Sequence, residues 1–181
     1  MVTGGCLGWS SVPPLLLSHP VGRANKFANY EWFMPKENIP FQIREMTIDD
    51  YPEIIDIWQT TPGTTIDEED SREKMVIFLN RNPGLSFVAM NSAGKIIGTI
   101  KGAQDGRRGY ISHMAVIPQY RSCGIAKVLA EQTVNGLMEQ GIGKCNLYVM
   151  DSNPNALSFW KHNGWKVLEY DFRMLQKRIA T

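Results

Sequence analysis

The sequence predicts an α/β fold in which a mixed, mostly antiparallel sheet is flanked by helices. Residues 41–46 alternate apolar and polar side chains, as a half-buried strand does. Residues 51–58 carry apolar side chains at helical spacing, and residues 115–129 contain a strand pattern, a turn with glycine and the start of a helix. With the segments between and after them, these patterns give the element order β-α-α-β-β-β-α-β-α-β-β.

Two helices are expected after the first strand. Residues 47–50 form a capping box, and Tyr51, Ile54, Ile55 and Trp58 then follow at helical spacing. Pro62-Gly63 ends this helix. An acidic start, which suits the helix dipole, predicts a second helix from Glu68 to Asn80.

The remaining elements build most of the sheet. Strands near residues 85–90, 96–102 and 110–116 are separated by turn sequences and predict an antiparallel meander. The main helix follows, with apolar residues at helical spacing from Ile125 onward. A strand at residues 145–150, a helix from Pro154 and two C-terminal strands complete the order.

Length and composition predict one domain, from residue 41 to 181. The chain has 181 residues, of which 43% are hydrophobic and 20% charged, enough for one packed core. Residues 1–40 show no sustained period and predict an extension without a compact fold. We expect no export signal there. Three interpretations stay open: a flexible leader, an added segment, or a dimer-contacting arm that uses Tyr30, Trp32 and Phe33.

Charge and cysteine content exclude several classes of function. A net charge of +1 gives no basic stripe for nucleic acid, and no segment suggests a membrane anchor. Cys6, Cys123 and Cys145 are too few and too scattered for a disulfide framework or a zinc site. No metal is expected, and a reducing cytoplasm fits this cysteine usage.

The segment after residue 116 predicts a binding site for a diphosphate. The first turn of a helix has N–H groups without intrahelical partners and a partial positive charge. Gly124 lets the backbone approach a ligand, Ala126 keeps the next turn thin, and Arg121 offers a fork of donors to phosphate oxygens. The spacing matches neither a Walker loop nor a dinucleotide fingerprint.

Two blocks of residues resemble the GNAT acetyltransferase superfamily. The run Val116-x-Pro-x-Tyr-Arg-x-x-Gly-Ile-Ala126 is similar to the family's acyl-CoA motif, Arg/Gln-x-x-Gly-x-Gly/Ala. The later run Asn153-x-x-Ala-x-x-Phe-Trp-Lys-x-x-Gly-Trp165 matches the family's next block, with Trp160 where tyrosine is usual. The resemblance covers residues 41 to 178.

This resemblance implies the GNAT fold, with a V-shaped splay between the fourth and fifth strands that holds acetyl-CoA. It implies direct acetyl transfer to a primary amine of a small molecule or a protein, by an enzyme that is a homodimer. The alternative is a non-catalytic acyl-CoA-binding module. By the same resemblance, the cofactor-binding residues are Met114, Ala115, Val116, Arg121, Ser122, Cys123, Gly124, Ile125, Ala126, Asn153, Phe159 and Trp160.

The catalytic groups are less clearly marked. His113 lies beside the expected thioester and titrates near neutrality, so it is a candidate general base. Strand alternation puts it on one face with Ile111 and Ala115, so a packed histidine is the competing interpretation. A water relay to the acids of residues 67–69 is a further alternative.

The general acid is in doubt because the Trp160 indole cannot supply a proton, which leaves Tyr148 as the candidate. Cys123 is not expected to act as a nucleophile, because the backbone of its turn faces the phosphates. The loop from Thr60 to Asp67 is expected to line the acceptor pocket, by analogy with the family.

Overall fold

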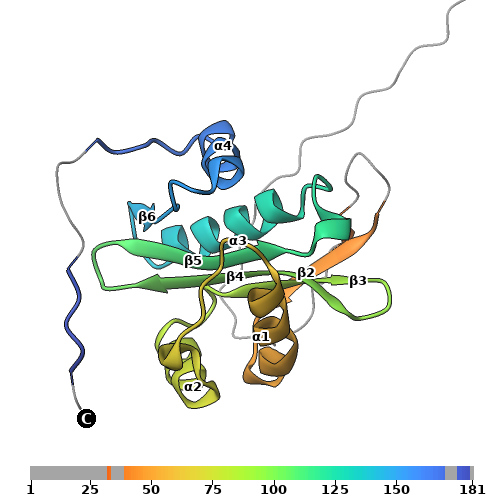
Figure 1. Cartoon of the computed structure of the whole chain (residues 1–181), viewed down its shortest axis with the longest axis horizontal. Helices are drawn as coiled ribbons and strands as arrows, with labels where there is room; N and C mark the ends of the chain where they lie inside the picture. Colours follow the sequence, from red (N-terminus) through yellow and green to blue (C-terminus); the bar gives the residue numbers. More distant parts are fainter. Residues whose placement is uncertain (1–31, 34–38, 170–174, 180–181) are drawn as a thin grey trace, which may run out of the picture.

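The computed structural model describes residues 32–33, 39–169 and 175–179, which form a sheet covered by helices on both faces (Figure 1). The sheet has six strands in chain order: β1 (Trp32–Phe33), β2 (Phe41–Glu45), β3 (Phe87–Asn91), β4 (Ile96–Gln104), β5 (Gly109–Val116) and β6 (Cys145–Leu147). The helices are α1 (Tyr51–Thr60), α2 (Arg72–Arg81), α3 (Ile125–Glu139) and α4 (Pro154–His162). Three short 3₁₀ turns are η1 (Ile48–Asp50), η2 (Glu68–Asp70) and η3 (Pro118–Tyr120).

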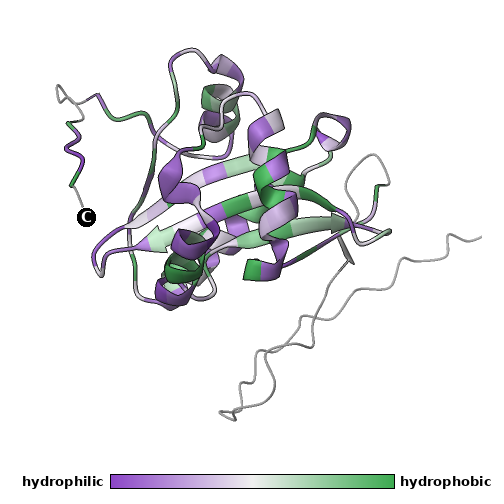
Figure 2. Ribbon diagram, turned by 60° about the horizontal axis from the view of Figure 1, so that its bottom comes forward, coloured by the Kyte–Doolittle hydropathy of each residue, from purple (hydrophilic) through white to green (hydrophobic). Residues whose placement is uncertain are grey.

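The helices divide between the two faces of the sheet. Helices α1 and α2 cover one face, and α3 covers the other with α4 beside it (Figure 1). Apolar residues gather where the helices meet the sheet, and hydrophilic residues lie on the outer sides of the helices (Figure 2). Each face therefore has its own hydrophobic core.

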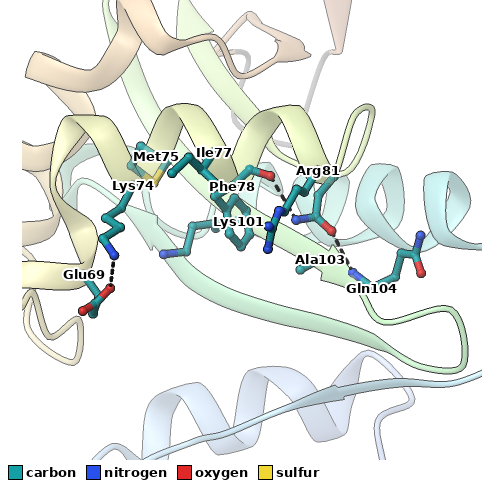
Figure 3. Close-up of a pocket in the computed structure, with 10 residues that line it drawn as sticks. Glu69, Lys74, Met75, Ile77, Phe78, Arg81, Lys101, Ala103 and Gln104 are labelled. Carbon is teal, nitrogen blue, oxygen red and sulfur yellow. Dashed lines mark hydrogen bonds and ion pairs between the residues drawn. The ribbon is translucent and has the colours of Figure 1, made fainter. Parts of the chain in front are cut away.

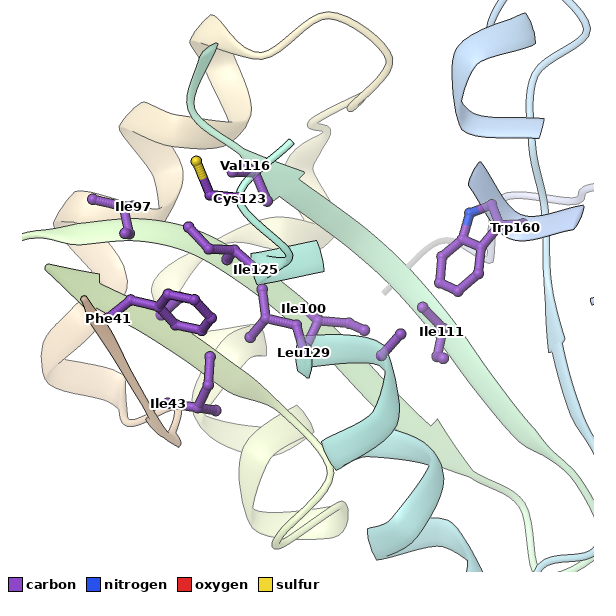
Figure 4. Close-up of a cluster of buried hydrophobic side chains, with 12 residues drawn as sticks. Phe41, Ile43, Ile97, Ile100, Ile111, Val116, Cys123, Ile125, Leu129 and Trp160 are labelled. Carbon is purple, nitrogen blue, oxygen red and sulfur yellow. The ribbon is translucent and has the colours of Figure 1, made fainter. Parts of the chain in front are cut away.

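The core on the α3 face contains Phe41, Ile100, Ile111, Leu129 and Trp160, drawn from β2, β4, β5, α3 and α4 (Figure 4). Helix α3 lies so close to β5 that a Cβ at Gly109 would come within 2.4 Å of the Leu137 side chain. Side-chain packing and a close helix–sheet approach thus fix the position of α3.

The α1 face follows the predicted pattern with small shifts. In α1, Ile54, Ile57 and Trp58 are buried, and the capping box joins Thr47 and Asp50 as expected. Helix α2 begins at residue 72 rather than 68, because the acidic segment forms η2. Asp67 caps that 3₁₀ turn, and Ser71 then caps α2.

The sheet is antiparallel from β1 to β5, and β6 is parallel to β5. Pairing between β5 and β6 ends at Ile111 and Leu147, although β5 continues to Val116. Strand β6 is therefore shorter than the predicted residues 145–150. The expected splay between the fourth and fifth predicted strands is confirmed, and it opens beyond Ile111.

The C-terminal strands are the main departure from the predicted order. Residues 165–169 and 175–179 belong to no strand, and residues 170–174 lie outside the described part of the chain. Val167, Leu168, Leu175 and Ile179 are largely exposed. An isolated segment with no neighbouring strand has no partner for its backbone groups, so the apolar pattern alone does not form a strand.

Before residue 39 the structure describes only β1, which pairs with β2 through Trp32–Gln42 and Phe33–Phe41. The rest of the predicted extension, including Tyr30, lies outside the described residues. The division at residue 40 and the three interpretations of the extension stay predictions.

Candidate functional site

The turn after β5 has the backbone geometry of an anion site. Ser122 and Gly124 have φ angles of 62° and 80°, in the left-handed region. Gly124 is the N-cap of α3, and no side chain caps the helix. Because the first amides of a helix need partners and lie at the positive end of its dipole, these N–H groups can receive phosphate oxygens.

The apolar side chains of this turn anchor it to the core. Cys123 and Ile125 are buried in the cluster of the α3 face, and Ala126 is half-buried against it. The Cys123 thiol also lies 3.4 Å from the Arg121 carbonyl oxygen. A thiol held in this way supports the turn and presents no surface to a thioester.

Arg121 ties the turn to the end of the neighbouring strand. Its Nε–H donates to the Val116 carbonyl oxygen at 3.0 Å, and the residue is exposed. This bond directs the side chain along the turn, where the Nη groups are suited to bidentate phosphate contacts.

Met114, Ala115 and Val116 lie on the part of β5 that continues past its pairing with β6. On the other side, Ala115 pairs with Thr99 and Val116 with Gly98 of β4. A strand with one open side can pair with an extended ligand as an added strand would. The splay thus leaves an edge beside the anion turn.

Helix α4 closes the other side of the splay. Asn153 Oδ1 accepts from the Ala156 N–H at 3.1 Å, so Asn153 is the N-cap with Pro154 after it. Trp160 is 6% exposed and packs edge-on against Phe159 and Trp165, with ring centroids 5.1 and 4.9 Å away. Trp160 faces β5 from α4 as part of the core (Figure 4).

Tyr148 lies just past the end of β6, with 76% of its surface exposed. Tyr148 is therefore not part of the hydrophobic core. An exposed phenol keeps its freedom to rotate, and no hydrogen bond to another described residue holds Tyr148 toward the splay.

His113 lies at a β-bulge. Thr99 pairs with Ala115 and Lys101 with Ser112, so two residues of β5 oppose the single residue Ile100 of β4. His113 has a φ angle of 50°, in the left-handed region. The bulge reverses the alternation: Ile111 packs on the α3 face and Ala115 on the α1 face. The expectation that His113 shares a face with Ile111 is therefore wrong, since His113 packs on the α1 face.

The His113 imidazole is part of a cluster of polar groups with little exposure. Nε2 lies 3.4 Å from Asp70 Oδ2 and 3.2 Å from the Thr65 carbonyl oxygen. Asp70 Oδ1 accepts from Lys101 Nζ at 2.9 Å, and the side chains of Asp70 and Lys101 are only 8% and 10% exposed. The Trp58 ring packs on the imidazole, 4.4 Å between centroids.

The charges in this cluster set its protonation. Burial favours the neutral Asp70 carboxyl, but the Lys101 hydrogen bond and charge outweigh burial and hold the Asp70 pKa below its usual value. For His113, burial and the Lys101 charge lower the pKa more than Asp70 raises it. The imidazole is therefore neutral at pH 7, as a general base must be.

Sequence reasoning missed Asp70 and Lys101. The only signal was a lysine within the strand near residues 96–102, where a buried strand of apolar residues was expected. A lysine in such a position needs a buried anion, which would have directed attention to the nearby acids.

The acids of residues 67–69, the alternative route for a water relay, have other partners. Asp67 Oδ1 accepts from the Glu69 N–H at 2.8 Å. Glu69 pairs with Lys74 at 3.3 Å and Glu68 with Arg178 at 2.5 Å, both on the surface. These acids belong to the solvated 3₁₀ turn η2 and its cap, which precede α2.

The loop between α1 and α2 crosses the splay. Thr65 meets His113 of β5 through its carbonyl oxygen, and a Cβ at Gly63 would lie 2.5 Å from Asn153 Nδ2 at the start of α4. The loop therefore contacts both sides of the splay, and its role in lining the acceptor pocket stays a prediction.

A groove lies between α2 and β4, next to this cluster (Figure 3). Its volume is about 390 Å³. Lys101 is shared by the groove and the cluster, with Nζ 5.0 Å from the Phe78 ring centre. The lining residues are Glu69, Lys74, Met75, Ile77, Phe78, Arg81, Asn82, Lys101, Ala103 and Gln104.

Two searches of the described residues found no candidates. In residues 32–33, 39–169 and 175–179, no cluster of His, Cys, Asp or Glu is suited to hold a metal ion. Over the same ranges, no helix has the length and apolar character needed to cross a membrane.

Comparison with known proteins agrees with this geometry. The sequence model of the acetyltransferase (GNAT) family matches residues 42–165. The chain is similar to acetyltransferase SG1711 of Sodalis glossinidius (strain morsitans), with 32% identity over 76% of this chain and 95% of the relative. It is also similar to acetyltransferase plu1384 of Photorhabdus laumondii, with 34% identity over 77% and 93% of the two chains.

A solved structure supports the fold. PaiA N-acetyltransferase of Thermoplasma acidophilum, in complex with coenzyme A, superposes with a TM-score of 0.63 at 24% identity, over 72% of this chain and 92% of that one. The match over residues 42–165 contains both the anion turn and the block from Asn153 to Trp165. The chain therefore belongs to the GNAT family and is an acetyl-CoA-dependent N-acetyltransferase.

Proposed function

We propose that the enzyme acetylates a primary amine that approaches the thioester from the α1 face of the sheet, with His113 as general base. The observation that carries the proposal is the bulge in β5, which turns the imidazole to that face beside the open part of the strand. The anion turn lies at the end of the same strand. Donor and acceptor would thus meet beside the residues of β5 that follow His113.

Acetyl-CoA would bind mainly through backbone groups. The turn from Arg121 to Ala126 would hold the pyrophosphate, and the open edge from Met114 to Val116 would pair with the pantetheine. The amides of Ala115 and Val116 are candidates to stabilise the oxyanion. Asn153, Phe159 and Trp160 would border the pantetheine from α4. Burial of the last of these in the core supports a packing role.

The transfer needs one proton acceptor on the amine side. The amine nitrogen attacks the thioester carbonyl carbon, and the resulting ammonium proton passes to His113. The oxyanion then collapses, the C–S bond breaks, and the thiolate leaves with the electron pair. The imidazolium then releases its proton to solvent and the thiolate takes one from solvent, so the products are an amide and free CoA. A neutral histidine meets this requirement near pH 7.

We further propose that the thiolate leaves without a side-chain acid. Trp160 packs in the core and its indole does not donate a proton at useful pH. The exposure of Tyr148 also supports the departure of the thiolate without a side-chain acid.

For the acceptor we favour a small-molecule amine over a protein amino group. The loop from residues 61 to 67 contacts His113 and Asn153 across the splay, and a site bordered by such a loop would suit a small substrate. We also propose a homodimer in a reducing cytoplasm. The free thiols of Cys123 and Cys145 are compatible with that location, and light scattering after size exclusion would test the dimer.

The test combines a substrate screen with His113→Gln. Amines and peptides are incubated with acetyl-CoA, and thiol release is measured. For a turned-over amine, His113→Gln should lower kcat by roughly 10²- to 10⁴-fold without changing acetyl-CoA affinity. His162→Gln, at the exposed end of α4, is the matched control and should retain full activity. Full turnover by His113→Gln would contradict the assignment.

A further inference from the structure

The strongest unexplained feature of the cluster is the second ring nitrogen of His113. Nδ1 is inaccessible to solvent and has no hydrogen-bond partner among the described residues. A buried polar atom without a partner costs about 1–3 kcal/mol, so a retained one calls for a function.

The other ring nitrogen defines the tautomer. Both groups near Nε2 are acceptors: the Thr65 carbonyl oxygen at 3.2 Å and Asp70 Oδ2 at 3.4 Å. Since Asp70 is ionised, neither of them can donate, and Nε2 must carry the hydrogen. The neutral ring then has its lone pair on Nδ1, which is the atom without a partner.

The position of Asp70 is itself well determined. Its carboxylate accepts from Lys101 Nζ at 2.9 Å and from the Asp67 N–H at 3.4 Å, which closes the capping box of η2. Lys101 lies between the Trp58 and Phe78 rings, 5.4 and 5.0 Å from their centres. Two rigid elements, η2 and β4, therefore fix the groups that face the imidazole.

We propose that Asp70 is a positioning residue for acetyl transfer: with the Thr65 carbonyl oxygen it holds the Nε2–H of His113 and so presents the Nδ1 lone pair as the proton acceptor. Lys101 also donates to the Asp70 carboxylate, and its positive charge weakens the attraction of Asp70 for a protonated imidazole. This proposal rests on the proposed function of His113 as base. The acceptor amine, or a water bound with it, would be the missing partner of Nδ1. Because Nδ1 is inaccessible to solvent, the groups that cover it would have to move when the acceptor binds.

Lys101 gives the proposal a pH signature. The charged groups that face the imidazole are Asp70 from η2 and Lys101 from β4. Helix α1 faces it with Trp58, and the α1–α2 loop with the Thr65 carbonyl, neither of which titrates. Removal of Asp70 should therefore lower the His113 pKa, and removal of Lys101 should raise it.

The first measurement is NMR of the full-length enzyme with ¹⁵N-labelled histidine. The ring nitrogen shifts of His113 should report the Nε2–H tautomer in the wild type. The His113 pKa should move down in Asp70→Asn and up in Lys101→Gln. The double variant keeps the cluster uncharged, which guards against misfolding of a single variant, and its His113 pKa should lie between those of the two single variants.

The second measurement is activity against pH. The acid limb of kcat/KM should follow the NMR pKa in each variant, and Asp70→Asn should lose at least about tenfold in kcat because its side chain can also donate to Nε2 and stabilise the wrong tautomer. An Nδ1–H tautomer in the wild type, or pKa shifts of the same sign in both single variants, would overturn the proposal. Because the NMR readout needs no turnover, it decides whether Asp70 orients the His113 ring separately from whether His113 is the base. Full activity of His113→Gln would overturn the role of both residues in acetyl transfer and leave the tautomer result intact.

Discussion

The candidate sites on the two faces of the sheet differ in how the chain builds them. On the α3 face the anion turn is made of consecutive residues, 121–126, and its candidate binding groups are backbone amides and the Arg121 side chain. On the α1 face the cluster around His113 joins side chains from α1, η2, β4 and β5. A diphosphate can be bound by a local motif of consecutive residues. Proton transfer depends on side chains that only the fold brings together.

The comparison predicts that the ionic cluster is the more fragile region. Lys101→Met leaves the Asp70 carboxylate in a largely buried site without its partner, which should cost on the order of 3 kcal/mol in urea unfolding. Adding Asp70→Asn should recover most of that loss. The control is Lys127→Met, which breaks an exposed pair with Glu131 and should cost less than about 1 kcal/mol. Equal losses for the two lysine variants would mean that the cluster is not a stabilising unit.

A substitution in the anion turn should abolish acetyl-CoA binding without unfolding the protein. Acetyl-CoA at 100 times its dissociation constant should raise the free energy of unfolding by about 2.7 kcal/mol. Gly124→Glu adds strain at a φ of 80° and a negative charge at the anion site, so this increase should disappear in thermal unfolding. Gly94→Glu adds the same charge at a φ of 78° in an open hairpin turn and should keep it. A normal ligand shift in Gly124→Glu would exclude this turn as the phosphate site.

The same contrast explains what could be predicted from the sequence. Helices α1 and α2, strands β2 to β5 and the anion turn all have local signals: capping residues, apolar periods and a glycine at the required spacing. The bulge at His113 has none, because one extra residue in β5 looks like ordinary alternation. The Asp70–Lys101 pair joins residues far apart in the chain. Lys101 is unusual in its apolar strand, but nothing in that segment identifies Asp70 as its partner.

In the C-terminal region the sequence predicted strands that the described residues do not form. Two strands were expected after the helix from Pro154, yet Val167 and Leu168 in that segment are more than half exposed and lie outside the sheet. A strand depends on a neighbour as much as on its own residues, and local apolar character does not reveal whether a neighbour is present.

A smaller effect should appear in the pH dependence of stability. The His113 pKa is below its unfolded value of 6.5, so below pH 6.5 the unfolded chain binds a proton that the folded chain does not. The free energy of unfolding should therefore fall as the pH drops from 6.5 to the folded pKa of His113. Asp70 acts at lower pH, since its contribution is present above 3.8 and is lost as the pH falls through its lowered pKa. His113→Gln should remove the first of these losses and leave the second, in urea titrations from pH 7.5 to 3.

The smallest expected effect concerns Tyr148, and it tests whether the α1 face carries the whole proton chemistry. A general acid contributes roughly 10²- to 10⁴-fold, so a true donor would be unmistakable. Because Tyr148 is 76% exposed and lies past the end of β6, Tyr148→Phe should change kcat by no more than about twofold. Trp160→Phe should reduce turnover modestly through packing, since the ring meets Phe159 and Trp165 in the core. A hundredfold loss in Tyr148→Phe, with acetyl-CoA affinity unchanged, would show that the thiolate does take its proton from a phenol. The proton chemistry would then involve the segment after β6 as well as the His113 cluster, and it would not be confined to the α1 face.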